Sequence, residues 1–180
     1  MSDFTEIIKG RRSIRKYEEK EVPESALQQI LEAVQWAPSW TNCQCWEVLI
    51  IKNPETRAKI QETIGPKNPA TKAVVAAPLL LALCAKKEVS GYYNGQASTK
   101  FGDWNMFDMG IATQNICLTA HSLGLGTVIV GLFDHDKAAE ILKVPDSHEL
   151  MVLIPLGYPA KISKAPERRK IEEFTHEETF

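Results

Sequence analysis

The stretch WNMFDMGIATQNICLTAHS, residues 104–122, predicts a helix with apolar side chains on nearly every face. A helix that is hydrophobic all round must be buried all round. A chain of 180 residues leaves little other protein to cover such a helix. We therefore expect a central helix that is shared with a second subunit.

The segments on either side of this helix predict alternating helices and strands. Leu27, Ile30 and Val34 recur at the spacing of one buried helical stripe, and Asn53 followed by Pro54 is a typical helix start. The predicted helices span residues 3–9, 23–37, 53–65, 104–122 and 134–144, and the predicted strands span residues 46–51, 79–85, 126–133 and 149–159. This interleaving predicts an α+β fold, with a mixed central sheet of about four to five strands flanked by helices.

The end of the chain differs in composition from the rest. We take residues 1–158 as a single domain and residues 159–180 as an extended arm. The arm has little apolar periodicity and carries five cations between Lys161 and Lys170, so it is either disordered or laid across another surface. Residues 86–103 are polar and contain glycine, which predicts a mobile excursion or a lid.

Charge and hydropathy exclude several classes of protein. A net charge of −2 argues against a dedicated nucleic-acid binder. Every apolar run falls short of the roughly 20 residues that a membrane span needs, and the start MSDFTEIIKG lacks the apolar stretch of a signal peptide. We therefore expect a soluble, cytoplasmic protein that binds neither nucleic acid nor a membrane.

The cysteines fall into two groups. Cys84 and Cys117 lie in apolar segments and are expected to be small buried hydrophobic residues. Cys43 and Cys45 could suggest a metal or redox pair, but no second cluster of cysteine or histidine completes a tetrahedral site. We therefore assign no metal to this chain.

The segment RRSIRKY, residues 11–17, packs four cations into six positions. In an extended segment alternate side chains face the same way, so Arg11, Ser13 and Arg15 would share one face. Two guanidinium groups with a hydroxyl between them form a claw for a phosphate or another delocalised anion. The alternative is a solvated basic loop, which is the commoner origin of a basic run.

Four motifs in this chain resemble the landmarks of the FMN-dependent nitroreductase family. They are RRSIRKY, APSWTNCQCW, DMGIATQNICLTAHSLGLGT and LIPLGYPA…PERRKIEEF, and together they cover nearly the whole chain in the family's order and spacing. The resemblance implies an α+β homodimer with FMN at the subunit interface, each site built from both chains, and an arm that wraps the partner. It also implies that NADH or NADPH reduces the cofactor in a ping-pong cycle, with nitroaromatics, quinones or related small molecules as acceptors.

The same resemblance implies which residues bind the cofactor. Arg11, Arg12, Ser13 and Arg15 would hold the ribityl phosphate and the pyrimidine edge, and Arg168 and Arg169 would close on the phosphate. Pro38, Ser39, Trp40 and Asn42 of the partner subunit would wall the ring, with Gln44 reaching the same region. Val130 and Gly131 would approach the central ring nitrogen with backbone groups.

The chemistry expected of such a site rests on the cofactor. A fixed cation beside the pyrimidine ring, for which we choose Arg15, would favour the reduced cofactor. We assign no catalytic residue, because the protein only needs to position the cofactor and leave one face open.

The chain departs from the family pattern at Trp40, where a second serine is usual, and at Cys45, where a proline is usual. An indole at this place would narrow the acceptor pocket or stack on an aromatic acceptor. Two alternatives stay open: a reductive dehalogenase or flavin-fragmenting enzyme of the same fold, and a non-enzymatic FMN carrier. Residues 86–103 could form a substrate lid, but they show no clear set of groups for a zwitterion.

Overall fold

The sheet at the centre of the protein is antiparallel. The computed structural model describes residues 3–180, so Met1 and Ser2 of the predicted domain lie outside the described residues. The strands are β1 (Trp46–Ile51), β2 (Leu79–Lys86), β5 (Gly126–Thr127) and β6 (His148–Gly157), in the order β1-β2-β6-β5. All three pairings between these strands are antiparallel. The α+β class is confirmed, with four strands and flanking helices.

The parallel component expected of a mixed sheet is reduced to one bridge. This bridge joins Ser13 to Thr127 next to the sheet edge. The chain runs beside β5 only at this point and then turns away, so no parallel strand develops. The strand predicted at 126–133 is also shorter than expected: only Gly126–Thr127 pairs continuously, and Val130 returns to β6 through a single bridge to Leu153.

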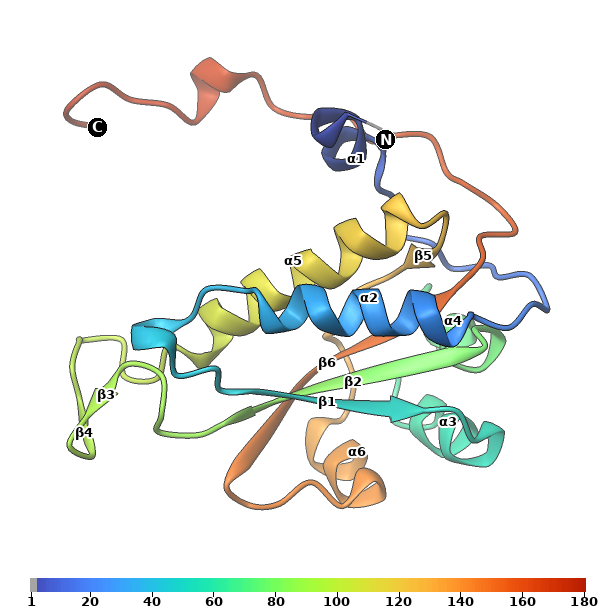
Figure 1. The fold of residues 1–180 in the computed structure, drawn as a ribbon, viewed down its shortest axis with the longest axis horizontal. Helices are drawn as coiled ribbons and strands as arrows, with labels where there is room; N and C mark the ends of the chain where they lie inside the picture. The colour runs from blue at the N-terminus through green and yellow to red at the C-terminus, as the bar shows by residue number, and fades with distance from the viewer. Residues whose placement is uncertain (1–2) are drawn as a thin grey trace.

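Strand β2 is buried on both faces, which explains its continuous apolar sequence. Leu79, Leu81 and Leu83 pack in the cluster that contains the buried side chains of α2 (Glu24–Gln35) and α5 (Asn105–Ser122). Alternate residues from Leu80 to Cys84 pack against α3 (Pro54–Gln61), α4 (Thr71–Ala76) and α6 (His135–Leu142). Figure 1 shows the sheet between these two helical layers.

Helix α5 is buried on one side only within this chain. Its buried stripe includes Asp108, Met109, Ala112, Ile116 and Ala120. On its other side Met106 is 63% exposed and Phe107 is 60% exposed. In the single chain α2 and the sheet cover only the face toward the core, and the expectation that a second subunit covers the other face stays a prediction.

Several short elements complete the fold. Helix α1 (Phe4–Gly10) precedes the basic segment, and α4 was not predicted from the sequence. The 86–103 segment contains a short hairpin of β3 (Tyr92–Tyr93) and β4 (Gln96–Ala97). Residues 3–180 also contain two short 3-10 helices, Trp40–Asn42 in the loop after α2 and Ile171–Glu173 in the arm.

The C-terminal arm leads away from the layered body, as Figure 1 shows in red. Every residue from Ala160 to Phe180 is exposed in the single chain. Among the residues that the structure describes, no helix is long and apolar enough to cross a bilayer.

Candidate functional site

The basic segment lies against the edge of the sheet. The backbone N–H of Ile14 donates to the carbonyl oxygen of Thr127 at 2.8 Å, next to the bridge between Ser13 and Thr127. Ile14 is buried, while Arg11, Arg12 and Ser13 are half-buried and Arg15 is exposed. The sheet edge therefore fixes the backbone of the segment and leaves its polar side chains accessible.

The arginines of this segment lack a carboxylate partner. Within residues 3–180, the salt bridges are Lys52–Glu24, Lys87–Glu149 and Arg169–Glu173. Instead, Nη1 of Arg12 donates to the carbonyl oxygens of Lys9 at 2.6 Å and Arg11 at 2.8 Å, and Nη1 of Arg15 reaches that of Ser13 at 3.4 Å. Three guanidinium charges so close together without a counter-charge favour an anionic ligand.

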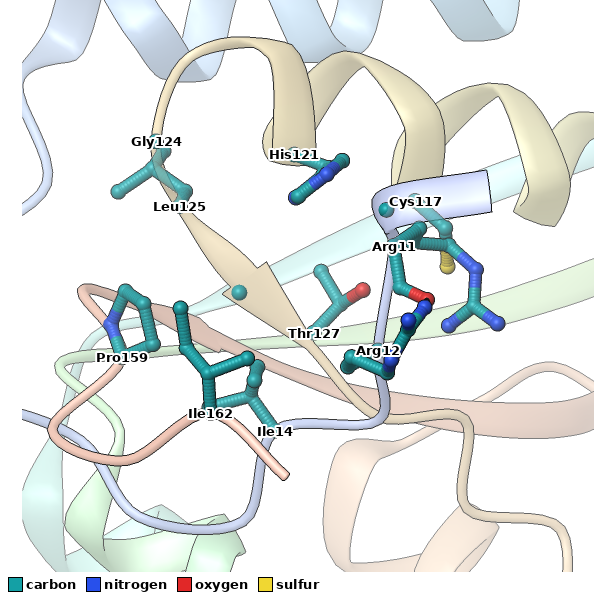
Figure 2. A pocket seen from close by; sticks show the side chains of 12 residues that line it. Arg11, Arg12, Ile14, Cys117, His121, Gly124, Leu125, Thr127, Pro159 and Ile162 are labelled. Atoms are coloured by element: carbon teal, nitrogen blue, oxygen red, sulfur yellow. Dashed lines mark hydrogen bonds between the residues drawn. The ribbon is translucent and has the colours of Figure 1, made fainter. Parts of the chain in front are cut away.

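A small cavity of about 100 Å³ separates the basic segment from the C-terminal end of α5. Figure 2 shows Arg11, Arg12, Cys117 and His121 around it. Burial lowers the pKa of His121, and the charges of Arg11 and Arg12 lower it further. The imidazole is therefore neutral at pH 7 and adds no further positive charge to the cavity wall.

Two side chains of α5 pack closely against the start of the basic segment. Burial raises the pKa of the Cys117 thiol, although a hydrogen bond from Thr127 and the charge of Arg11 oppose this change. The thiol is therefore protonated and packs as a small apolar group. A Cβ on Gly10 would lie 2.8 Å from Nε2 of His121, so only glycine fits here without displacing the ring.

The polar loop at 38–44 is anchored at the opposite end of α5. The backbone N–H of Trp40 donates to the Asp108 carboxylate at 3.1 Å, and Ser39 Oγ accepts from the backbone N–H of Gln44 at 2.9 Å. The ring of Trp40 packs 5.3 Å from that of Trp104. Pro38, Asn42 and Gln44 are exposed, so their side chains are available to another molecule.

The structure does not bring this loop to the basic segment. Asp108 contacts the loop, and His121 lines the cavity beside Arg11, thirteen residues further along α5. At 1.5 Å per residue, the two ends of the helix are about 20 Å apart. One chain therefore carries the two predicted halves of the site at opposite ends of its central helix, as Figure 1 shows for α1 and the loop after α2.

Val130 and Gly131 lie three and four residues after Thr127, the β5 residue that pairs with the basic segment. The backbone N–H and carbonyl of Val130 both pair with Leu153, at 2.9 Å. Gly131 is exposed, and a Cβ added to it would meet no atom within 4 Å. The backbone at Gly131 therefore faces open space that a planar ligand can approach.

The tail arginines lie apart from the basic segment in the hydrogen-bond network. Arg169 pairs with Glu173, its Nε lying 3.4 Å from Oε2. Within the described residues, neither Arg168 nor Arg169 forms a hydrogen bond or ion pair with residues 11–15. Within a single chain the tail therefore contributes Pro159 and Ile162 to the cavity wall, but neither of its two arginines.

Asp108 brings together side chains that are distant in the sequence. Its Oδ2 atom accepts a hydrogen bond from Ser90 Oγ at 2.7 Å and lies 3.7 Å from the sulfur atoms of both Cys43 and Cys45. Burial, together with the smaller effects of the nearby Cys43 and Asp108, raises the pKa of Cys45 to about 12. This cluster could not be predicted from the sequence, because Asp108 lies more than sixty residues beyond the two cysteines.

Comparisons with known proteins identify the family. Residues 8–158 match the nitroreductase family. The chain is 35% identical over 163 residues to a Methanothermobacter thermautotrophicus protein provisionally named NADH dehydrogenase/NAD(P)H nitroreductase, covering 88% of this chain and 78% of the relative. It is 31% identical over 197 residues to a Bacillus subtilis FMN reductase [NAD(P)H], covering 100% of this chain and 75% of the relative.

Solved structures agree with the sequence relatives. The structure of an FMN-dependent nitroreductase from Clostridium difficile matches with a TM-score of 0.81 and 27% identity, over 98% of this chain and 99% of that chain. A more distant relative is iodotyrosine deiodinase 1 of Mus musculus, 24% identical over 192 residues, which cover 93% of this chain and 66% of the relative.

Proposed function

Because this chain belongs to the nitroreductase family, we propose that it is an FMN-dependent oxidoreductase that takes electrons from NADH or NADPH and passes them to a small-molecule acceptor. Two similarities support the cofactor and the donor: one relative is named an FMN reductase [NAD(P)H] and one structural neighbour an FMN-dependent nitroreductase. When bound, FMN supplies the redox chemistry, and the residues of this chain bind it, orient it and control access to it.

The observation that carries the proposal is the group of arginines without a counter-charge. The ribityl phosphate bears a charge of about −2, which suits converging guanidinium groups. Arg11 and Arg15 have nitrogens free to donate, while Arg12 is already oriented by the carbonyls at the end of α1. Ser13 adds a hydroxyl between them. We assign Arg11, Arg12 and Ser13 to the phosphate side and Arg15 to the pyrimidine edge.

The open backbone at Gly131 suits the flat ring of the cofactor. Gly131 has no side chain to hold the ring away, and Val130 is fixed by its two hydrogen bonds to Leu153. We assign the backbone of these two residues to the central part of the ring.

The other half of the site comes from a second copy of the chain in this proposal. The loop with Pro38, Ser39, Trp40 and Asn42 lies about 20 Å from the basic segment of the same chain. This distance is too large for the ring of one FMN molecule to contact both closely. A homodimer that pairs the exposed faces of α5 would bring the loop of one subunit toward the basic segment of the other, with Gln44 beside it. This pairing would also cover Met106 and Phe107, which are exposed in the single chain.

The arm completes the proposed dimer. An arm that is exposed from residue 160 onward would gain cover by lying across the partner subunit. Exposed apolar side chains at Ile162, Ile171 and Phe174 fit such a contact. Arg168 and Arg169 would then reach the phosphate in the assembled dimer, where the single chain leaves them without a role.

We propose nitroaromatics, quinones or related compounds as acceptors. Donor and acceptor would occupy the same open face in turn, which is a ping-pong cycle. Trp40 and Trp104 form an aromatic pair beside the loop, and this pair would stack on a planar acceptor or limit its size.

Reductive dehalogenation is the second candidate activity. It is supported by the similarity to iodotyrosine deiodinase 1 over 93% of this chain. Iodide release from an iodinated tyrosine, measured with the chemically reduced protein, distinguishes the two activities. Release at a rate above that of nitroaromatic or quinone reduction would favour the dehalogenase.

The experiment that tests the proposed function is an anaerobic titration of the purified yellow protein with NADH and, separately, NADPH. Rapid bleaching of the flavin absorbance, followed by reoxidation on adding a quinone, is the expected result. A flavin that neither nicotinamide reduces would favour a carrier of FMN without enzymatic activity. Arg11→Ala and Arg15→Ala should each raise the Kd of FMN roughly tenfold or more, as loss of one charge-assisted contact predicts. Lys137→Ala, an exposed cation on α6, serves as the control and should leave the Kd unchanged.

A further inference from the structure

The side chains of Cys43, Cys45 and Asp108 converge at the N-terminal end of α5. We propose that these three residues form a binding site for a thiophilic divalent cation, with Zn²⁺ as the expected ion. The inference rests on the geometry and chemistry of this cluster and is independent of the flavin function.

The distances between the three ligand atoms suit tetrahedral zinc. Oδ2 of Asp108 lies 3.7 Å from each sulfur, and all three ligand atoms lie within 4.8 Å of one another. With Zn–S near 2.3 Å and Zn–O near 2.0 Å, the edge between sulfur and oxygen in a tetrahedron is about 3.5 Å. The atoms are therefore only a few tenths of an ångström from the positions that zinc requires on these edges.

The carboxylate is held in place by groups outside the set of ligands. Asp108 is 2% exposed, and it accepts hydrogen bonds from the backbone N–H of Trp40 and from the fully buried Ser90 hydroxyl. The Trp40 N–H is shared between Oδ1 and Oδ2, and the Ser90 hydroxyl bonds to Oδ2. A carboxylate has about four lone-pair positions, so these bonds leave room for a metal ion. Such supporting hydrogen bonds fix the direction of a ligand and commonly accompany metal sites.

The two thiols differ in access, which gives the ion an entry path. Cys45 is buried, whereas Cys43 is half-buried at the surface side of the cluster. The backbone turns at Gln44, where φ is 48°, and both sulfurs lie 3.7 Å from Oδ2 of Asp108. In the proposed site a water molecule would take the fourth position of the tetrahedron on the side of Cys43.

The electrostatics favour exchange of protons for the ion. Without metal, both thiols lie within hydrogen-bond distance of one Asp108 oxygen. When a divalent cation binds, both S–H bonds break, two metal–sulfur bonds form, and two protons leave to the solvent. The net charge of the cluster stays at −1, so binding adds no uncompensated charge to a buried site. Two thiolates also select a thiophilic ion against Mg²⁺ or Ca²⁺.

A bound ion would join three segments of the chain. Cys43 and Cys45 belong to the loop before β1, Asp108 to α5, and Ser90 to the segment that carries the β3–β4 hairpin. The proposed role is therefore structural: the metal would fix the loop and the hairpin segment against the end of α5.

The test is calorimetric titration of the full-length, reduced and chelator-treated protein with ZnCl₂ in two buffers of different ionisation enthalpy. We expect one zinc ion per chain, release of two protons, and no heat with MgCl₂. Cys45→Ser and Asp108→Asn should weaken binding at least tenfold. Cys84→Ser is the matched control, because Cys84 is also buried and reduced but lies in β2 outside the cluster, and it should bind zinc like the unmodified protein.

Two results would overturn the proposal. The first is the absence of zinc binding by the unmodified reduced protein, with no thiolate-to-metal absorption on adding CdCl₂. The second is binding that persists in the Cys43→Ser/Cys45→Ser double variant or is lost equally in Cys84→Ser. The cadmium absorption needs no substitution, so it decides the matter even where a variant fails to fold.

Discussion

Replacing Gly126 with alanine should displace the basic segment and weaken FMN binding without touching any residue assigned to the cofactor. A Cβ at this position would lie 2.5 Å from Cγ1 and 2.8 Å from Cβ of Ile14. Ordinary contact between carbon atoms begins at about 3.5 Å, so Ile14 must move by about 1 Å. The backbone N–H of Ile14 donates a hydrogen bond to Thr127, and Ile14 lies between Ser13 and Arg15. The basic segment therefore has to move together with Ile14.

The size of the effect follows from two terms. Overpacking of this kind costs about 1–3 kcal/mol of folding free energy. Losing one charge-assisted hydrogen bond to the phosphate costs about 1.5–3 kcal/mol of binding free energy. The second term corresponds to a rise in the Kd of FMN of roughly tenfold to a hundredfold.

The assay is a titration of the apoprotein with FMN, followed by quenching of the flavin fluorescence, with thermal unfolding measured in parallel. Gly65→Ala is the matched control, because a Cβ there would meet no atom within 4 Å. It should leave the Kd of FMN unchanged. If Gly126→Ala lowered the melting temperature but bound FMN as tightly as Gly65→Ala, the assignment of residues 11–15 to the cofactor would be refuted.

Three further perturbations test other parts of the account. Trp40→Ser should change the KM for bulky quinones more than the Kd of FMN, since the indole packs beside the acceptor space. If steady-state kinetics with acceptors of graded size showed no change in KM, Trp40 would not belong to the site. Truncation after Pro159 should weaken dimerisation and FMN binding together, because it deletes the arm with Arg168 and Arg169. If light scattering showed a loss of dimer while the Kd of FMN stayed unchanged, or the reverse, the shared role of the arm would be contradicted. Urea unfolding should show stability falling from pH 7 to pH 5, because the pKa of His121 is lowered in the folded state and the unfolded chain binds the proton more readily. His121→Gln should flatten this slope, and an unchanged slope would dismiss the contribution of His121.

Local signals in the sequence were enough to predict most of the fold. The apolar stripe from Leu27 to Val34, the helix start at Asn53 and the continuous apolar run of β2 each predicted an element that the structure contains. The expectation of a continuous strand at 126–133 was wrong, because a β-forming composition does not show whether a neighbouring strand is present to pair with it. After Thr127 this segment pairs with β6 only at Val130, and Ile129 and Leu132 are exposed.

The candidate site was predictable only in part, because side chains converge through the fold. The four cations of RRSIRKY suggested an anion site, and within residues 3–180 the structure shows none of them in a salt bridge with a carboxylate. The sequence could not show that the loop at Trp40 and the basic segment lie at opposite ends of α5. It also could not show that Asp108 approaches both Cys43 and Cys45, since that contact depends on how α5 packs under the loop.

Subunit complementation distinguishes an FMN site built from two chains, as proposed, from a site built within one chain. The Arg11→Ala/Arg15→Ala variant removes the basic half, and Pro38→Trp places an indole in the loop half, so neither homodimer should retain FMN. Heterodimers carrying one copy of each variant, isolated with two different affinity tags, combine both defects in one site and leave the other site intact. We expect about one FMN per heterodimer and the return of turnover with NADH or NADPH. Heterodimers without flavin or turnover would contradict it, because each site would then lie within a single chain.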